Sequence, residues 1–287
     1  MMEITLNNGE TLFYRKREGG ETLLLLIHGN LASSDQWDIL LETLPIEYTI
    51  YAIDLRGYGK STYHKPIKAL NDFALDIELF CNELNLKSSH LIGLSNGGGI
   101  AMQFAANYPS RVEKLILLAS ISTRGYPAYN SNGARLQSKE EIASDSMINR
   151  MLNAQKAQEM SFFEAAMNQL VYPHSKPEKA RLEKDVEAAL NQRNMVDVAD
   201  AANRFNLSSV SNGVAEGTGE LQRINASVLV LWGQNDLMVL EQMTLEIIHD
   251  MKEHDIDVTY KVLNTGHSPL VDDIQSVVSE IEGFLQK

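Results

Sequence analysis

The sequence is poor in cysteine, in basic residues and in long apolar runs, and each shortage excludes a class of protein. A single cysteine, Cys81, cannot form an intramolecular disulfide and fits a reducing cytoplasm, where we expect the protein to reside. No stretch approaches about 18 consecutive apolar residues, so we expect no membrane span. The N-terminus, MMEITLNNGE, lacks the basic and apolar regions of a secretory signal.

The charge balance and the absence of metal motifs narrow the range of partners. The chain has 25 basic and 38 acidic side chains, which gives a formal net charge of −13 at pH 7. Such a surface repels phosphate backbones, so we expect no nucleic-acid partner. There is no His-Glu-x-x-His motif, no cysteine pair and no calcium-binding loop, so we predict no metal and no cofactor. Acidity favours solubility and leaves the oligomeric state open.

What the chain does contain is an alternation of strand-like and helix-like segments. A hairpin around Asn8-Gly9 comes first, and apolar runs such as LLLLIHGN and YTIYAIDL follow it. These runs lack polar alternation, as strands covered on both faces do. Helical spacing separates them, for example over residues 71–85 and 97–107. The alternation predicts an α/β fold with a mostly parallel sheet and helices on both of its faces.

The alternation stops near residue 122 and resumes near residue 222. The intervening segment is polar and helix-prone, lacks a strong strand and holds five of the eleven methionines. About a hundred residues are too many for a loop inside a compact domain. We therefore predict a core domain of residues 1–121 and 223–287, with a helical cap of residues 122–222 inserted after the sixth strand. The cap methionines either shape an adaptable pocket or fill the packing between cap and core.

A serine stands among glycines at the end of the fifth predicted strand, in GLSNGGG. Ligands of an open parallel sheet bind at the carboxyl ends of its strands, and Ser95 fits the Gly-x-Ser-x-Gly nucleophile elbow there. Side chains at Gly93 or Gly97 would collide with the neighbouring strand or helix. We assign Gly98 and Gly99 to close packing of the next helix on the sheet. That helix directs its N-terminal amides towards the place where negative charge develops.

A serine nucleophile needs a base, and the base needs a carboxylate that orients it. His267, in NTGHSPL, follows the last predicted strand and is the candidate base. Asp236, in LWGQNDLMV, follows the seventh strand and is the candidate partner of that base. His28 reaches the same edge, and we interpret it as a residue that orients its own loop.

The remaining acidic and titratable residues have simpler interpretations. Asp54 is expected to fix its own loop by pairing with Arg56, and Asp272 and Asp273 are alternatives to Asp236 that would instead cap the last helix. Cys81 lies in a helical pattern as a buried apolar thiol. The other histidines are expected on the surface or at an edge: His64, His90, His174, His249 and His254.

The chain order serine, aspartate, histidine is that of the α/β-hydrolase fold. LLLLIHGN, YAIDLRGYGKS, GLSNGGG, VLVLWGQNDLMV and NTGHSPL resemble the successive blocks of the α/β-hydrolase superfamily. More narrowly, the sequence is similar to capped bacterial esterases and lactonases, including intracellular polyhydroxybutyrate depolymerases. The resemblance implies an α/β-hydrolase fold with an eight-stranded, mostly parallel sheet.

The resemblance also implies roles for individual residues. Ser95 would be the nucleophile, His267 the base and Asp236 the partner of that base. The backbone N–H groups of Asn30 and Asn96 would form an oxyanion hole. These positions agree with the need for one donor just after the nucleophile and one from the early loop.

The type of nucleophile indicates the type of reaction. A serine forms acyl-enzymes, whereas related enzymes with an aspartate at the elbow attack saturated carbon. We therefore expect hydrolysis of a small or medium carboxylic ester or lactone. Perhydrolysis, thioester hydrolysis, carbon–carbon bond hydrolysis and a non-catalytic receptor of the same fold are the alternatives. Leu240 stands where many relatives have proline, which affects a turn more than the chemistry.

Overall fold

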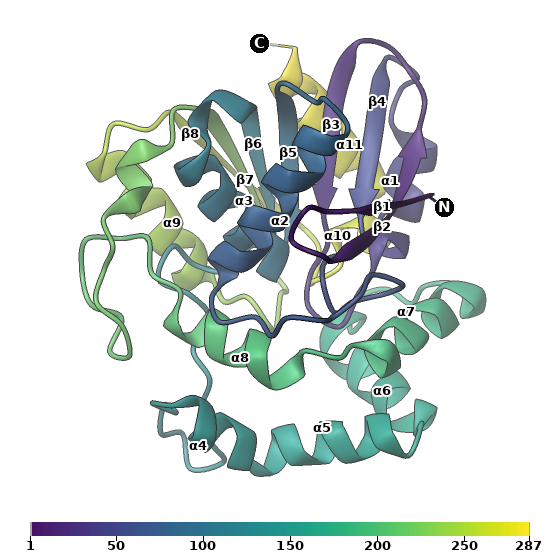
Figure 1. The fold of residues 1–287 in the computed structure, drawn as a ribbon, viewed down its shortest axis with the longest axis vertical. Helices are drawn as coiled ribbons and strands as arrows, with labels where there is room; N and C mark the ends of the chain where they lie inside the picture. The colour runs from purple at the N-terminus through teal and green to yellow at the C-terminus, as the bar shows by residue number, and fades with distance from the viewer. Residues whose placement is uncertain (1, 287) are drawn as a thin grey trace.

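The computed structural model describes residues 2–286 and contains one eight-stranded sheet (Figure 1). The strand order is β1-β2-β4-β3-β5-β6-β7-β8. The pairs β1–β2 and β2–β4 are antiparallel, and all other neighbouring strands are parallel. The strands are Met2–Thr5 (β1), Thr11–Arg17 (β2), Thr22–Ile27 (β3), Tyr48–Ile53 (β4), Ser89–Leu94 (β5), Val112–Leu118 (β6), Ser227–Gly233 (β7) and Val258–Leu263 (β8). The predicted sheet is therefore confirmed.

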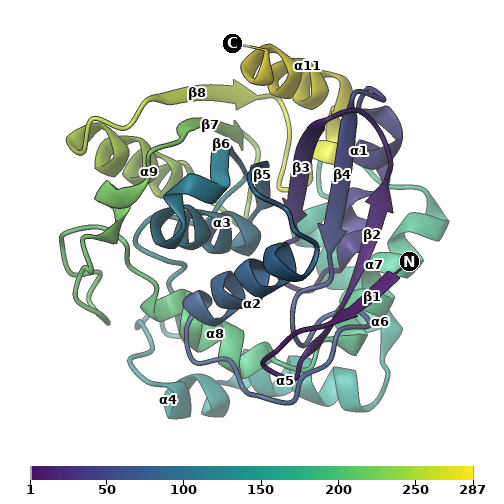
Figure 2. The same cartoon turned by 45° about the horizontal axis from the view of Figure 1, so that its top comes forward.

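Helices cover both faces of the sheet (Figure 2). One face carries α2 (Leu70–Glu83), α3 (Asn96–Asn107) and α9 (Glu241–Glu253), and the other carries α1 (Asp38–Thr43), α10 (Pro269–Asp272) and α11 (Ile274–Leu285). The run LLLLI in β3 is apolar throughout because its side chains alternate between two cores. Leu25 and Ile27 belong to the first core, whereas Leu24 and Leu26 belong to the second.

Five further helices lie between β6 and β7 and gather on one side of the molecule (Figure 1). They are Lys139–Ser144 (α4), Ser146–Lys156 (α5), Met160–Ala166 (α6), Lys179–Asn191 (α7) and Met195–Arg204 (α8). We call these helices the cap, and its boundaries at residues 122 and 222 stay a prediction. Met151, Met167 and Met195 pack in an apolar cluster of the cap, whereas Met147 and Met160 are exposed.

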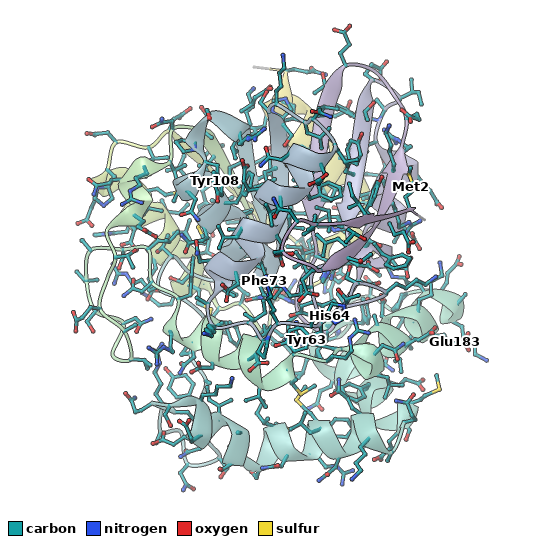
Figure 3. All side chains as sticks on the ribbon, in the orientation of Figure 1. Met2, Tyr63, His64, Phe73, Tyr108 and Glu183 are labelled. Atoms are coloured by element: carbon teal, nitrogen blue, oxygen red, sulfur yellow. The ribbon has the colours of Figure 1, made fainter. Side chains whose placement is uncertain are left out.

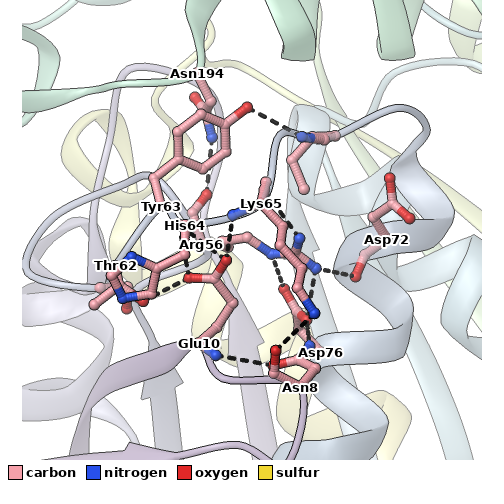
Figure 4. Close-up of polar contacts among 12 residues, drawn as sticks. Asn8, Glu10, Arg56, Thr62, Tyr63, His64, Lys65, Asp72, Asp76 and Asn194 are labelled. Carbon is pink, nitrogen blue, oxygen red and sulfur yellow. Dashed lines mark hydrogen bonds and ion pairs between the residues drawn. The ribbon is translucent and has the colours of Figure 1, made fainter.

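A buried polar network fixes the loop that follows β4 (Figure 4). The Glu10 carboxylate accepts hydrogen bonds from the backbone N–H groups of His64, at 3.0 Å, and Lys65, at 2.8 Å. Arg56 donates from Nε and Nη2 to the two oxygens of Asp76 on α2, at 2.7 Å each. Arg56 is 6% exposed and Asp76 is 1% exposed, so this ion pair is buried.

Asp54 fixes its loop as predicted, although its expected pairing with Arg56 is wrong. Its two carboxylate oxygens accept the N–H groups of Ser34, at 2.7 Å, and Lys60, at 2.9 Å. The guanidinium of Arg56 turns instead to Asp76, which α2 brings from a position 20 residues further along the chain. The sequence motif contained no sign of this partner.

Most of the remaining titratable residues lie where the sequence predicts. Burial raises the pKa of the Cys81 thiol to about 12, in agreement with an inert apolar role. The prediction that His90 lies at the surface or at an edge is wrong. His90 belongs to β5, which lies between β3 and β6, and its side chain is buried. Three other histidines are exposed, and one is partly exposed: His64, His174, His249 and His254. Within residues 2–286 no helix combines the length and apolar character needed to cross a bilayer.

Asp76→Ala is expected to lower the free energy of unfolding by about 3 to 5 kcal/mol, because it leaves the buried Arg56 charge without a partner. Urea denaturation measures this loss. The double variant Arg56→Met/Asp76→Leu should lose far less, since it removes both charges. Glu183→Ala, which breaks an exposed pair with Lys179 at 3.7 Å, serves as the control and should change stability by under about 0.5 kcal/mol. Equal losses for Asp76→Ala and Glu183→Ala would contradict the assigned role of the buried pair.

Candidate active site

Ser95 occupies a strained turn between β5 and α3. Its backbone has φ 54° and ψ −120°, a conformation that residues other than glycine rarely adopt. The Ser95 N–H donates to the carbonyl of Leu118 on β6 at 2.9 Å, which ties the turn to the neighbouring strand. The geometry is that of the predicted nucleophile elbow, in which strain lifts the hydroxyl off the sheet edge.

The glycines around Ser95 are required by backbone contacts. A Cβ at Gly93 would overlap the carbonyl of Gly97, and a Cβ at Gly97 would overlap the carbonyl of Ile27. At Gly98 it would strike the side chain of Ser120 and at Gly99 that of Ile121, both just beyond β6. The predicted reasons for Gly93 and Gly97 are confirmed, and at Gly97 α3 lies at backbone contact distance from β3. Gly98 and Gly99 allow close packing as predicted, but against side chains of the loop after β6 and not against the sheet itself.

Asp236 and His267 meet at the same edge of the sheet. Asp236 follows β7 and His267 follows β8, and His267 Nδ1 lies 2.8 Å from Asp236 Oδ2. The other carboxylate oxygen accepts the N–H groups of Met238, at 2.7 Å, and Val239, at 2.9 Å. An ionised carboxylate only accepts hydrogen bonds, so beside it Nδ1 is the donor, and in the neutral ring Nε2 then has a lone pair. This is the contact that the predicted roles of His267 and Asp236 require.

The acidic alternatives to Asp236 have structural roles. Asp273 is the N-cap of α11, where its carboxylate accepts the N–H of Ser276 at 3.1 Å, as predicted. Asp272 does not cap that helix. It ends α10 and accepts the N–H of Gly266 at 2.6 Å, because the short α10 turns it back towards the loop of His267.

His28 fixes the loop that follows β3 and has no nitrogen to spare for chemistry. It is fully buried, its Nδ1 donates to the Gly29 carbonyl at 2.7 Å, and its Nε2 accepts the N–H of Leu55 at 3.0 Å. Burial lowers the pKa of His28, so the ring stays neutral and Nε2 stays an acceptor. The predicted loop-orienting role is confirmed.

Two backbone N–H groups near Ser95 are available to a ligand. Asn96 is the first residue of α3, so its N–H has no acceptor inside the helix. Among the acceptors of residues 2–286, none takes the N–H of Asn30. A Cβ built on Gly29 would lie 3.2 Å from Cβ of Ser95, so the loop of Asn30 runs directly beside the serine.

Some of the predicted site residues are in direct contact in the structure, and others lie close to one another without a hydrogen bond. Asp236 and His267 are hydrogen bonded, and Gly29 and Asn30 run alongside Ser95. In the part of the chain that the structure describes, the Ser95 hydroxyl makes no hydrogen bond, as is common in catalytic sites without substrate. Ser95, Asp236 and His267 follow the carboxyl ends of β5, β7 and β8, which are parallel strands of the same sheet with β6 between β5 and β7.

Apolar side chains of the cap lie beside two loops of this site. Leu31, next to Asn30, and Val271, which follows His267 by four residues, pack against the apolar cluster of the cap. The cluster includes Phe163, Met167, Tyr172 and Met195. On the cap side the loops of Asn30 and His267 therefore have apolar neighbours, together with the polar side chain of Gln192 at the Asn30 loop.

Sequence reasoning missed the side chains that support the Asn30 loop. Gln36 accepts the N–H of Gly29 at 2.9 Å, and Tyr58 and Gln192 both donate to Oδ1 of Asn30. Gln192 comes from the cap, 162 residues away from Asn30. No local motif marks it, because its partners are set by how the cap meets the core.

The fold and the strand-end residues together define a class, that of capped α/β proteins with a nucleophile elbow. The family described as the alpha/beta hydrolase fold matches residues 22–273, and the chain belongs to that family. This confirms the family and fold that the sequence motifs predict.

The curated relatives include a lipase and an acetyltransferase component. Monoacylglycerol lipase ABHD6 of Homo sapiens is 25% identical over 78% of this chain and 64% of its own length. A dihydrolipoyllysine-residue acetyltransferase component of the acetoin cleaving system, from Cupriavidus necator, is 32% identical over 40% of this chain. This chain spans only 30% of the length of that component.

Two solved structures share the fold over nearly the whole chain. An esterase from Exiguobacterium antarcticum has a TM-score of 0.77 at 19% identity and covers 99% of each chain. The enol-lactonase from Burkholderia xenovorans LB400 has a TM-score of 0.77 at 17% identity and covers 100% of each chain. At these identities the likeness supports the fold of the chain.

Gly97→Ala is expected to lower the free energy of unfolding by about 1 to 3 kcal/mol or more, because the new methyl group overlaps backbone that cannot move aside. Thermal or urea unfolding measures the loss. Gly283→Ala is the matched control, since Gly283 lies exposed in α11 with no atom within 4 Å of a new Cβ. That variant should gain up to about 1 kcal/mol from helix propensity. A Gly97→Ala protein as stable as wild type would contradict the close approach of α3 to β3.

Proposed function

We propose that the protein is a serine hydrolase that cleaves a small or medium carboxylic ester or lactone through an acyl-enzyme on Ser95. The observation that most directly supports this function is the Asp236–His267 hydrogen bond of 2.8 Å, at the sheet edge where Ser95 stands in a strained turn. The family match adds to this support, because the family includes serine esterases of the same residue order.

In the proposed reaction the Ser95 hydroxyl attacks the substrate carbonyl while Nε2 of His267 accepts its proton. Asp236 remains ionised and stabilises the imidazolium through the Nδ1 hydrogen bond. The collapsing tetrahedral intermediate expels the alcohol, which takes the proton back from His267. Water, deprotonated by the same nitrogen, then attacks the acyl-enzyme. The bond between the acyl carbon and Oγ of Ser95 breaks, Oγ takes the proton back from His267, and the carboxylic acid leaves.

The N–H groups of Asn30 and Asn96 are the proposed oxyanion hole. One follows the nucleophile directly and the other belongs to the loop that runs beside it, so both can point at the same oxygen. Loss of one such donor costs comparable enzymes about 10²- to 10³-fold in kcat. No metal or cofactor has a step in this scheme.

The apolar cluster of the cap supports an ester or lactone with an apolar acyl or alkyl group. Leu31 and Val271, which stand next to Asn30 and near His267, pack against that cluster. Names of relatives and similar structures agree with such substrates, since they include monoacylglycerol lipases, an esterase and an enol-lactonase.

Wild-type protein is expected to react with a fluorophosphonate probe and to hydrolyse short activated esters, whereas Ser95→Ala should do neither. Intact-mass spectrometry measures the adduct, and a panel of esters graded in acyl length, with several lactones, measures turnover. A folded wild-type protein that neither labels nor turns over any of these compounds would refute the proposed function.

Asp236→Asn is expected to reduce kcat by about 10⁴-fold with little change in folding, because an amide partner favours the wrong imidazole tautomer. Asp273→Asn is the control, since this carboxylate caps α11 and has no contact with His267. Steady-state kinetics on the best ester of the panel compare the two variants. If both variants kept wild-type kcat, Asp236 would not be the partner of the base.

A further inference from the structure

The loop that carries Asn30 is held in a conformation that its sequence does not favour. Leu31 has φ +56°, in the left-handed region where a branched apolar side chain is strained. Such a conformation persists only where the surroundings fix it. The identity of the groups that fix Leu31 therefore bears on how the neighbouring N–H of Asn30 is aimed.

Gln192, which follows the last residue of cap helix α7, forms hydrogen bonds with both Asn30 and Leu31. Its Oε1 accepts the N–H of Leu31 at 3.0 Å, and its Nε2 donates to Oδ1 of Asn30 at 2.8 Å. The second hydrogen of Nε2 goes to Oδ1 of Asn194 at 2.8 Å. Gln192 is only 3% exposed, so its carboxamide is buried and both of its donors are used.

Gln192 itself rests on the fixed part of the core. Nδ2 of Asn194 donates to the carbonyl of Arg56 at 2.8 Å, and Arg56 is anchored by the buried network with Asp76 (Figure 4). Tyr58, from the same loop, donates to Oδ1 of Asn30 at 2.9 Å. Asn194 is 1% exposed, so the bonds that join it to Gln192 and to the Arg56 carbonyl are shielded from competing water, whereas Asn30 itself is exposed.

We propose that Gln192 is a positioning residue, through which the cap sets the direction of the oxyanion-hole N–H of Asn30. Gln36 fixes the residue before Asn30, by accepting the N–H of Gly29, and Gln192 fixes the residue after it. The peptide plane between these two anchors carries the Gly29 carbonyl, which accepts from Nδ1 of His28, so Gln36, His28 and Gln192 together restrict its rotation. The inference rests on the proposed function, because it assigns a catalytic use to the N–H that Gln192 aims.

A variant of Arg193, the residue after Gln192, can separate a positioning role of Gln192 from a role that only attaches the cap to the core. Arg193 also joins the cap to the core, and its Nη2 donates to the backbone carbonyls of Tyr58, at 3.3 Å, and Ser61. None of these hydrogen bonds goes to residues 28–31. Replacing Arg193 therefore loosens the cap at nearly the same place while the bonds of Gln36 and Gln192 to the Asn30 loop remain.

The kinetic test compares Gln192→Met with Arg193→Met, since methionine keeps an unbranched side chain and removes the polar contacts. We expect Gln192→Met to lower kcat about 10- to 100-fold with KM within about 3-fold of wild type, because a misaimed donor is lost mainly in the transition state. Arg193→Met should keep kcat and alter at most KM. Both variants should retain the wild-type melting temperature closely enough to be folded at the assay temperature.

A second readout does not depend on activity. Hydrogen exchange followed by NMR should show the Leu31 amide exchanging at least about 10-fold faster in Gln192→Met, and at the wild-type rate in Arg193→Met. Support requires both the kcat loss and the faster exchange, each specific to Gln192→Met. Any other combination in an active wild-type background would overturn the positioning role alone. A wild-type protein without fluorophosphonate labelling or esterase activity would overturn the proposed function, and the inference with it.

Discussion

The backbone contact between α3 and the end of β3 is the constraint on which the site depends. At Gly97 the helix approaches the carbonyls of Ile27 and His28 so closely that no side chain fits. This contact brings the strained Ser95 turn against the loop of Gly29 and Asn30. The proposed nucleophile and the proposed oxyanion donor are thus placed by one backbone-to-backbone approach, which explains why glycines surround a single hydroxyl.

Local chemistry and strand order make much of this molecule predictable from sequence. The apolar runs, the elbow and the strand-end positions of Asp236 and His267 depend on residues close in sequence, and the parallel sheet then brings the strand ends together. The misplaced residues have partners that come from elsewhere in the chain. Arg56 binds Asp76 from α2. His90 is not at an edge of the sheet, because β5 pairs with β3 on one side and with β6 on the other.

The cap is a second case in which contacts between distant parts of the chain could not be predicted from sequence. Its helices were expected from composition, but the hydrogen bonds by which it supports the loops after β3 and β4 come from single polar residues such as Gln192 and Asn194. A glutamine in a polar helical segment carries no local signal of a partner 162 residues away. Only the docking of the cap on the core reveals that its carboxamide completes the support of the Asn30 loop.

The burial of Cys81 has a practical consequence for studying the cap. This thiol is 3% exposed, and burial raises its pKa to about 12, so it forms almost no thiolate at neutral pH and alkylating reagents cannot reach it. A cysteine introduced at an exposed cap position such as Met147 would then be the one reactive thiol in residues 2–286. A fluorophore attached there would report on cap movement in the otherwise native sequence, without prior removal of Cys81.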